Sequence, residues 1–267
     1  KDADIVLTNK VYVGENELKD SSVKLICITA TGMNNVDLDY AKANNIEVKN
    51  AAGYSTSSVV QLGFSMIFYF VQKLNYYKNY VDEQNWQKSD TFTHIDKPFF
   101  ELDNKRVGII GLGEIGRDFA KKAKAFNCEV VYYSTSGQNT NNEYKSVTLE
   151  ELLKTSDIIS IHAPLNSKTK DLLAYKELNL LKDGAILLNL GRGGIINEPD
   201  LARILDEKNI FCGLDVVSKE PIEESNPLLK VVNKQRLVMT PHIAWASVEA
   251  RTRLIEKVAK NIEDFLK

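Results

Sequence analysis

Arg192, Glu220 and His242 each follow a predicted strand in the second half of the chain. Histidine exchanges protons near neutral pH, and a carboxylate beside it can orient the ring and stabilise its charged form. A guanidinium can bind a carboxylate or two neighbouring oxygen atoms through paired hydrogen bonds. Taken singly, the arginine is explained as well by a surface ion pair, and a lone histidine is more often structural than catalytic. Because all three follow strands of one predicted sheet, they can converge on one crevice as an acid–base site.

A glycine-rich turn lies upstream, in the run 106–116, which reads as a short apolar strand that ends in G-x-G-x-x-G and enters a helix. Gly111 permits the tight turn, Gly113 lets the backbone approach a pyrophosphate, and Gly116 lets the helix pack closely on the strand. The N–H groups and the positive dipole end of that helix favour a pyrophosphate. With the strand at 129–133, the run forms a strand-helix-strand unit of about thirty residues, which predicts a dinucleotide site.

Strand and helix patterns alternate along most of the chain, as is typical of a doubly wound parallel sheet. Residues 148–151 resemble a capping box that opens a helix, and Pro199 suits the first turn of another. The amphipathic segment 247–267 is expected to cross back and pack on the N-terminal part of the chain. Residues 82–104 are interpreted as a connecting segment. The predicted strands span 4–8, 23–30, 46–48, 106–110, 129–133, 157–162, 185–189, 210–217 and 236–240.

Composition narrows the class of protein. The 267 residues, 43% of them hydrophobic, suffice for one large or two ordinary globular domains, and a net charge of −2 argues against nucleic acid or an anionic membrane as a partner. Cys27, Cys128 and Cys212 stand singly in apolar runs, which predicts buried thiols, no metal site and a reducing, cytoplasmic location. The most apolar stretch, 59–71, is too short to span a bilayer comfortably and is predicted to be a buried helix.

The other two histidines are weaker candidates for chemistry. His94 lies in the connecting segment and is predicted to be a solvated loop group. His162, two residues before Pro164, ends a predicted strand near the expected cofactor crevice, where it either lines the adenosine side or belongs to the turn.

These motifs resemble the D-isomer-specific 2-hydroxyacid dehydrogenase family, and the resemblance covers nearly the whole chain. It implies a Rossmann nucleotide domain, a smaller flavodoxin-like α/β domain and a cleft between them. It also implies NAD(H) or NADP(H) as cofactor, a small 2-keto or 2-hydroxy acid as substrate, and a homodimer built on the nucleotide domains. The matching runs are 30–37, Gly-Leu-Gly-Glu-Ile-Gly at 111–116, Gly-Arg-Gly-Gly at 191–194, and Thr-Pro-His-Ile-Ala-Trp-Ala-Ser at 240–247, which is similar to glycerate dehydrogenase and hydroxypyruvate reductase members.

The resemblance also assigns roles to residues. The family's catalytic arginine, glutamate and histidine fall on Arg192, Glu220 and His242. The backbone of 31–33 would contact the substrate carboxylate, and Trp245 would either wall the substrate pocket or pack against the terminal helix. The substrate-binding residues implied are Thr31, Gly32, Met33, Arg192 and Trp245. The cofactor-binding residues implied are Gly111, Gly113, Glu114, Ile115, Gly116, Ser134, His162 and Pro164, with Asp215 near the nicotinamide carboxamide and Val59 and Val60 near its ring.

The chain departs from the family pattern at two places. Members that prefer NAD commonly carry an acidic residue where this chain has Ser134, so no carboxylate is present there to repel the 2′-phosphate of NADP. No arginine adjoins Ser134 to bind that phosphate either. NAD is therefore favoured, with NADP as the alternative. The family normally has a further strand and helix, about forty residues, before the position matched by Lys1. The smaller domain is therefore expected to be truncated at its N-terminus, either because the sequence is a fragment or because this domain is reduced. That substrate domain is predicted to comprise 1–53 and 247–267, and the nucleotide domain 54–246.

The sequence therefore predicts an NAD(P)-dependent D-2-hydroxyacid dehydrogenase in which His242 is the general acid and base for a substrate such as hydroxypyruvate, glyoxylate or glycerate. The alternative is a non-catalytic, dinucleotide-sensing binding protein on the same fold, since a fold alone does not imply an activity.

Overall fold

The computed structural model describes residues 2–138 and 142–267, and the chain divides into two compact units. The first unit comprises Lys1–Ser58 and Trp245–Lys267, and the second comprises Val59–Ala244. Both are built from parallel strands and helices, as predicted for an α/β fold.

A three-stranded parallel sheet forms the centre of the first unit, in the order β1-β2-β3. Every residue of the central strand β2 is buried, and its side chains alternate between the two faces. Ile26 and Ile28 pack with Leu18 and Ala41, whereas Leu25 and Cys27 belong to a cluster on the opposite face. The elements are β1 (Ile5–Thr8), α1 (Glu15–Leu18), β2 (Leu25–Ile28), α2 (Leu38–Ala43) and β3 (Glu47–Asn50).

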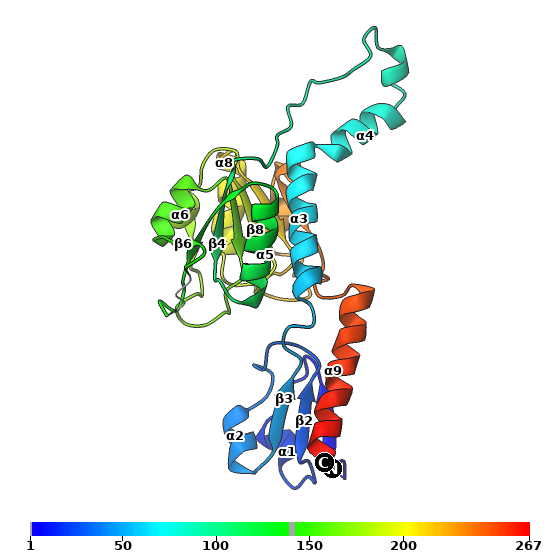
Figure 1. Ribbon diagram of the computed structural model, residues 1–267, viewed down its shortest axis with the longest axis vertical. Helices are drawn as coiled ribbons and strands as arrows, with labels where there is room; N and C mark the ends of the chain where they lie inside the picture. Colours follow the sequence, from blue (N-terminus) through cyan, green and yellow to red (C-terminus); the bar gives the residue numbers. More distant parts are fainter. Residues whose placement is uncertain (1, 139–141) are drawn as a thin grey trace. The chain divides into compact units, whose positions relative to one another are not determined.

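The terminal helix α9 (Val248–Leu266) covers the second face of this sheet and lies beside β2 in Figure 1. Ser247 caps it, because its Oγ accepts a hydrogen bond from the N–H of Ala250 at 3.1 Å. Ala250 and Leu254 are buried against the Leu25 and Cys27 face of β2. The prediction that the last segment crosses back to the N-terminal part of the chain is therefore confirmed.

The second unit is built on a seven-stranded parallel sheet in the order β10-β9-β8-β7-β4-β5-β6. Chain order runs one way from β4 through β5 to β6 and the other way from β7 to β10, so the sheet is doubly wound about β4, and the predicted fold class is confirmed. The strands are β4 (Arg106–Ile110), β5 (Glu129–Tyr133), β6 (Lys145–Ser146), β7 (Ile158–Ile161), β8 (Ile186–Asn189), β9 (Phe211–Leu214) and β10 (Leu237–Met239).

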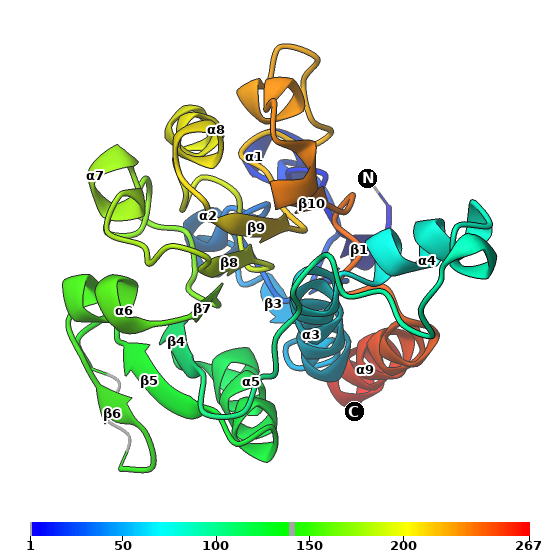
Figure 2. The same cartoon turned by 90° about the horizontal axis from the view of Figure 1, so that it is seen from above.

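Helices cover both faces of this sheet. Figure 2 shows α6 (Leu149–Thr155), α7 (Tyr175–Leu178) and α8 (Glu198–Glu207) along one face, and α3 (Thr56–Gln72) and α5 (Glu114–Ala125) along the other. The packing of α3 on α5 is close: the rings of Phe64 and Phe119 stack with their centroids 4.8 Å apart. Two short 3₁₀ turns, η2 (Pro227–Lys230) and η3 (Lys234–Arg236), precede β10. The predicted buried helix at 59–71 is confirmed, because α3 contributes eight buried residues.

Beyond α3, the helix α4 (Leu74–Asp82) and the 3₁₀ turn η1 (Trp86–Lys88) extend away from the seven-stranded sheet (Figure 1). Helix α4 was not predicted from the sequence. None of its residues is buried, so it lacks the buried apolar face by which a helix is recognised in a sequence.

The prediction that His94 is a solvated loop group is wrong. Its ring stacks on that of Tyr80 with the centroids 3.7 Å apart, and its Nε2 lies 2.8 Å from the hydroxyl of Tyr76. Only 15% of the His94 side chain is exposed. The reason is the unrecognised helix α4, which brings tyrosines one turn apart against the loop that returns to the sheet.

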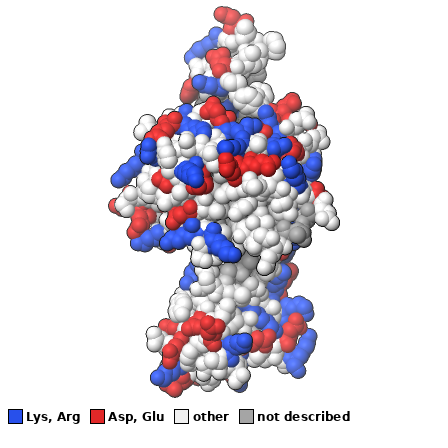
Figure 3. All heavy atoms as spheres, turned by 90° about the vertical axis from the view of Figure 1, so that its left-hand side faces the viewer, with Lys and Arg blue, Asp and Glu red and all other residues white. Residues whose placement is uncertain are grey.

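The three cysteines are free and buried, as predicted. Within the described ranges, no helix is long and apolar enough to cross a membrane, and no cluster of three or more His, Cys, Asp or Glu side chains is arranged to hold a metal ion. Figure 3 shows Lys and Arg side chains interspersed with Asp and Glu over the face in view.

Candidate active site

A pocket of about 520 Å³ lies where β4, β5 and β7 end in the second unit. Open α/β sheets bind ligands at this place, beside the strand where the order reverses. Five predicted cofactor residues line the pocket: Gly111, Gly113, Ser134, His162 and Pro164. Seven further lining residues were not predicted: Leu112, Thr135, Ser136, Gln138, Asn166, Ser167 and Lys168.

The three glycines of the turn have the geometry that a dinucleotide requires. Gly111 has φ +91°, and a Cβ there would lie 2.8 Å from the backbone nitrogen of Ala163. A Cβ on Gly116 would lie 2.3 Å from the carbonyl oxygen of Gly111, so the helix packs directly on the turn. At Gly113, by contrast, a Cβ would meet no described atom within 4 Å, which leaves the backbone open at the N-terminus of α5. The turn therefore fits a pyrophosphate.

Not every predicted cofactor residue lines this pocket. Glu114 and Ile115 form the first turn of α5, and Gly116 packs beneath it. Val60 is fully buried with Phe64 in the core between α3 and the sheet.

The part of the pocket formed by the segment after β5 and the loop after β7 carries hydroxyl groups and the ammonium of Lys168. Ser134, Thr135 and Ser136 follow β5, and Lys168 comes from the loop after β7. Among the lining residues that the structure describes, none is Asp or Glu. A phosphate on the ribose would therefore meet no carboxylate here.

Arg192 lies in the loop that follows β8, and Asn189 shapes that loop. The Oδ1 of Asn189 accepts a hydrogen bond from the N–H of Gly191 at 3.1 Å, and its Nδ2 donates to the carbonyl of Arg192 at 2.8 Å. Asn189 is 2% exposed, so its polar groups are buried and satisfied inside the turn. The Nη1 of Arg192 donates to the carbonyl of Gly191 at 2.8 Å.

Glu220 and His242 follow the next two strands, β9 and β10, and they are in contact. The Oε2 of Glu220 lies 2.6 Å from the Nδ1 of His242, and the two side chains are 31% and 27% exposed. A carboxylate accepts hydrogen bonds, so Nδ1 carries the proton and Nε2 is the atom that can exchange one with a ligand. Because β8, β9 and β10 are neighbours, Arg192 emerges at the same edge of the sheet.

The backbone at His242 is in the left-handed region, with φ +52°. Its N–H donates to the carbonyls of Asp215 and Thr240, both at 2.9 Å. Such a conformation in a residue other than glycine costs roughly 1–3 kcal/mol and is found where the surrounding structure enforces it, often at functional sites.

Comparisons with known proteins identify the family of this chain. The family model "D-isomer specific 2-hydroxyacid dehydrogenase, NAD binding domain" matches residues 64–244. The chain belongs to the D-isomer specific 2-hydroxyacid dehydrogenase family. This dehydrogenase is 38% identical over 272 residues to a hydroxypyruvate reductase of Blautia hydrogenotrophica, covering 100% of the chain and 83% of the relative. It is 35% identical over 266 residues to a glycerate dehydrogenase of Methylorubrum extorquens, covering 99% and 83%.

Among solved structures, the D-lactate dehydrogenase of Aquifex aeolicus, complexed with NAD and lactic acid, is similar with a TM-score of 0.84 and 27% identity. The match covers 99% of this chain and 83% of that chain. The dehydrogenase described here is thus an NAD(P)-dependent oxidoreductase that acts on the CH–OH group of 2-hydroxy acids. The alternative of a non-catalytic sensing protein is not favoured.

The carboxylate of Asp215 in the dehydrogenase stabilises the turn that carries His242, a role that was not predicted from the sequence. Its Oδ1 accepts hydrogen bonds from the Oγ1 of Thr240 and the N–H of Ile243, at 2.6 and 2.8 Å. Its Oδ2 accepts from the N–H of Ala244 at 2.8 Å. The buried carboxylate therefore folds the turn that carries His242.

The substrate residues predicted outside the nucleotide-binding unit lie in the first unit. The carbonyl of Thr31 accepts a hydrogen bond from the Nδ2 of Asn50 at 2.7 Å, and Met33 is exposed. Trp245 packs edge-to-face on Tyr54, with the ring centroids 6.4 Å apart, and against the cluster that includes α9. Both alternatives for Trp245, a wall of the substrate pocket and packing on the terminal helix, stay predictions.

Proposed function

We propose that His242, Glu220 and Arg192 are the catalytic set of this dehydrogenase. The observation that carries the proposal is the 2.6 Å contact between Glu220 and the Nδ1 of His242, made by a histidine in a strained backbone conformation. When bound, the nicotinamide supplies or accepts a hydride at the 2-carbon of the substrate. The residues of the chain manage the proton and hold the substrate.

In the reducing direction, the Nε2 of protonated His242 donates a proton to the carbonyl oxygen of the 2-keto acid. In the oxidising direction, the neutral ring accepts the hydroxyl proton at the same atom. Glu220 holds the ring by its Nδ1–H and stabilises the positive charge of the protonated form. Arg192 binds the substrate carboxylate or carbonyl oxygen through its guanidinium.

We further propose that the turn at 111–116, with Ser134, His162 and Pro164, binds the adenosine and pyrophosphate of the cofactor. In this proposal, Asp215 lies near the nicotinamide carboxamide and Val60 lies near the nicotinamide ring. NAD is the working cofactor in this proposal. NADP is the second candidate, because the hydroxyl groups after β5 and the ammonium of Lys168 suit a phosphate and no described carboxylate lines that side.

The substrate in this proposal is a small 2-keto acid such as hydroxypyruvate or glyoxylate, with glycerate as the hydroxy acid. Support comes from the names of the relatives, a hydroxypyruvate reductase and a glycerate dehydrogenase. The backbone of 31–33 is assigned to the substrate carboxylate and Trp245 to a wall of the substrate pocket.

A panel of short 2-keto acids, run in parallel with NADH and NADPH, tests this function. We expect turnover with hydroxypyruvate or glyoxylate and a higher kcat/KM with NADH than with NADPH. No oxidation of either cofactor with any keto acid would refute the catalytic proposal. NADH binding without turnover, together with capture of a protein partner, would favour the sensing protein instead.

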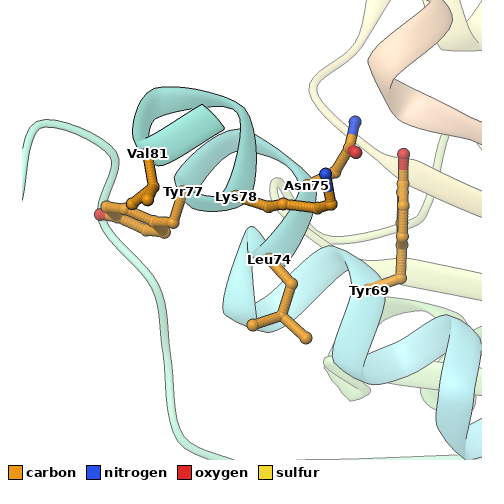
Figure 4. Close-up of a pocket in the computed structure, with 6 residues that line it drawn as sticks. All are labelled: Tyr69, Leu74, Asn75, Tyr77, Lys78 and Val81. Atoms are coloured by element: carbon orange, nitrogen blue, oxygen red, sulfur yellow. The ribbon is translucent and has the colours of Figure 1, made fainter. Parts of the chain in front are cut away.

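We propose that the protein is a cytoplasmic homodimer. Three unpaired, buried thiols suit a reducing compartment. The exposed apolar side chains around α4 suit a second copy of the chain as partner: Leu74 is 61% and Val81 49% exposed. With Tyr69 and Tyr77 they line a hollow of about 540 Å³ (Figure 4).

A further inference from the structure

Glu198 is a buried carboxylate outside the catalytic set. It is the first residue of α8 and is 7% exposed. None of the salt bridges formed by described residues includes it. A buried carboxylate is costly unless hydrogen bonds satisfy it, so its partners indicate what it holds in place.

Among the described residues, the hydrogen-bond partners of the Glu198 carboxylate all come from one segment, the loop after β9. Its Oε1 accepts from the N–H of Ser218, and its Oε2 accepts from the hydroxyl of Ser218 at 2.9 Å and from the Nδ2 of Asn226 at 2.7 Å. Glu220 lies between these two residues in the chain. One carboxylate therefore fastens the loop on both sides of Glu220.

Hydrogen bonds connect the anchored loop to His242 through Glu220. Ser218 N–H donates to Glu198, and the preceding N–H, that of Val217, donates to the Oε1 of Glu220 at 3.3 Å. The other oxygen of Glu220 contacts the Nδ1 of His242 at 2.6 Å. Two consecutive amides thus join the buried carboxylate to the one that orients the ring.

The opposite side of the loop is equally constrained. A Cβ on Gly193, next to Arg192, would lie 1.9 Å from the carbonyl oxygen of Val217. The loop after β9 therefore lies between Gly193, in the turn after β8, and Glu198. Its position leaves Glu220 little freedom in how it meets His242.

We infer that Glu198 is a positioning residue, which acts through the 217–220 loop to hold Glu220 against His242. The inference rests on the proposed function of the Glu220 and His242 pair. Besides Glu220, a second carboxylate, that of Asp215, contacts the turn that carries His242. Its two oxygens accept hydrogen bonds from Thr240, Ile243 and Ala244.

Glu198→Gln tests this inference. Glutamine has nearly the volume of glutamate, but its NH₂ group replaces one of the two oxygens that accept hydrogen bonds from Ser218 and Asn226, so one of these contacts is lost. In keto-acid reduction, His242 must be protonated, so kcat/KM falls as pH rises. We expect this alkaline limb to move to lower pH by about one unit and kcat at neutral pH to fall by about tenfold. The dissociation constant of NADH should not change, because Glu198 does not line the dinucleotide pocket.

Asp200→Asn is the matched control. Asp200 lies in the same first turn of α8, but its carboxylate accepts from the N–H of Tyr175 at 2.9 Å, on the side of α7. It should leave the pH profile unchanged. In the double variant Glu198→Gln with Glu220→Gln, the profile should match that of Glu220→Gln alone, because Glu198 then has no carboxylate left to position.

A separate measurement distinguishes failure of this inference from failure of the proposed function. The ring of His242, one of three histidines, can be titrated by NMR without any substrate. Its midpoint should fall in Glu198→Gln and stay unchanged in Asp200→Asn, even if no keto acid is turned over. If Glu198→Gln does not fold, Ser218→Ala removes one donor from the exposed end of the contact and should shift the midpoint the same way, by less. An unshifted midpoint, or a shift that persists beside Glu220→Gln, would overturn the inference.

Discussion

At the residue scale, the proposed chemistry depends on how one imidazole is held. His242 is oriented by Glu220 through Nδ1, and its backbone is held in the left-handed region by hydrogen bonds to Asp215 and Thr240. The strain is offset by the buried carboxylate of Asp215, which accepts three hydrogen bonds from the same turn. The ring thus has a fixed place before any ligand binds, which is the condition for efficient proton transfer.

His242→Gln should lower the turnover of keto-acid reduction by about two to four orders of magnitude. Glutamine has nearly the same reach and can still contact Glu220, but it cannot exchange a proton at neutral pH. Steady-state kinetics measure the loss, and fluorescence titration with NADH should show unchanged cofactor binding. Unaltered turnover would show that another group moves the proton.

Protonation of His162 should make the free energy of unfolding depend on pH. Burial lowers the pKa of its ring to about 3, and its Nδ1 has no hydrogen-bond partner among the described residues. In the unfolded chain the pKa is about 6.5, so the unfolded state takes up a proton as pH falls below that value while the folded state does not. The folded protein should therefore lose about 2 kcal/mol from this group between pH 7.5 and pH 5.

Urea unfolding of the cofactor-free protein at the two pH values, compared with His162→Gln, isolates this contribution. The variant should lose about 2 kcal/mol less than the wild type over that interval. Equal losses in the two proteins would show that His162 becomes protonated in the folded state.

At the scale of elements, each proposed catalytic residue follows a different strand of one sheet. The carboxyl ends of β8, β9 and β10 lie side by side because these strands are neighbours, although the residues they carry are 22 to 50 positions apart in the sequence. The same arrangement places the proposed dinucleotide pocket where β4 meets β7. Helices α3 and α5 support this edge by packing on the face of the sheet beneath β4 and β5.

Gly63→Val tests the close approach of α3 to α5. A Cβ on Gly63 would lie 2.8 Å from the Cε2 of Phe119, which is fully buried and cannot move away. We expect a loss of about 2–3 kcal/mol in the free energy of unfolding. Ser65→Val, on the exposed face of the same helix, introduces the same β-branched residue without the crowding and should change stability by less than about 1 kcal/mol. Equal effects of the two variants would contradict the packing argument.

At the scale of the whole molecule, the chain forms two units, and its last helix belongs with its first strands. The N- and C-terminal segments together build the smaller unit, in which α9 covers the Leu25 and Cys27 face of the sheet. The larger unit also carries α4 and the aromatic cluster of Tyr76, Tyr80 and His94, which pack on one another beyond the sheet. The apolar side chains left exposed there suit the proposed contact with a second copy.

Leu74→Asp combined with Val81→Asp should convert the proposed dimer into a monomer, because two carboxylates would be buried without partners in the contact. Analytical ultracentrifugation measures the mass in solution. Val232→Asp is the matched control: Val232 is 79% exposed in the same unit but lies after η2 and does not line the hollow at α4, so the variant should leave the dimer intact. A monomeric wild type, or a double variant that stays dimeric, would contradict this assignment.

The sequence by itself determined most of the local elements and the glycine-rich turn at 111–116. The spacing of Gly111, Gly113 and Gly116 is a requirement of backbone geometry, so it was readable without any tertiary contact. The alternation of apolar strands and amphipathic helices likewise predicted the parallel sheet and the return of α9. These patterns arise from short-range sterics and from one-sided burial, both of which leave a periodic trace in the chain.

Only the tertiary structure decided which side chains meet. The contact of Glu220 with His242, the anchorage of the same loop by Glu198 and the stacking of His94 on Tyr80 join residues 14 to 28 positions apart, and no local pattern encodes such pairs. Helix α4 was missed because it buries none of its side chains. Pairing at this range depends on strand order and loop path, which the packing of the whole unit selects.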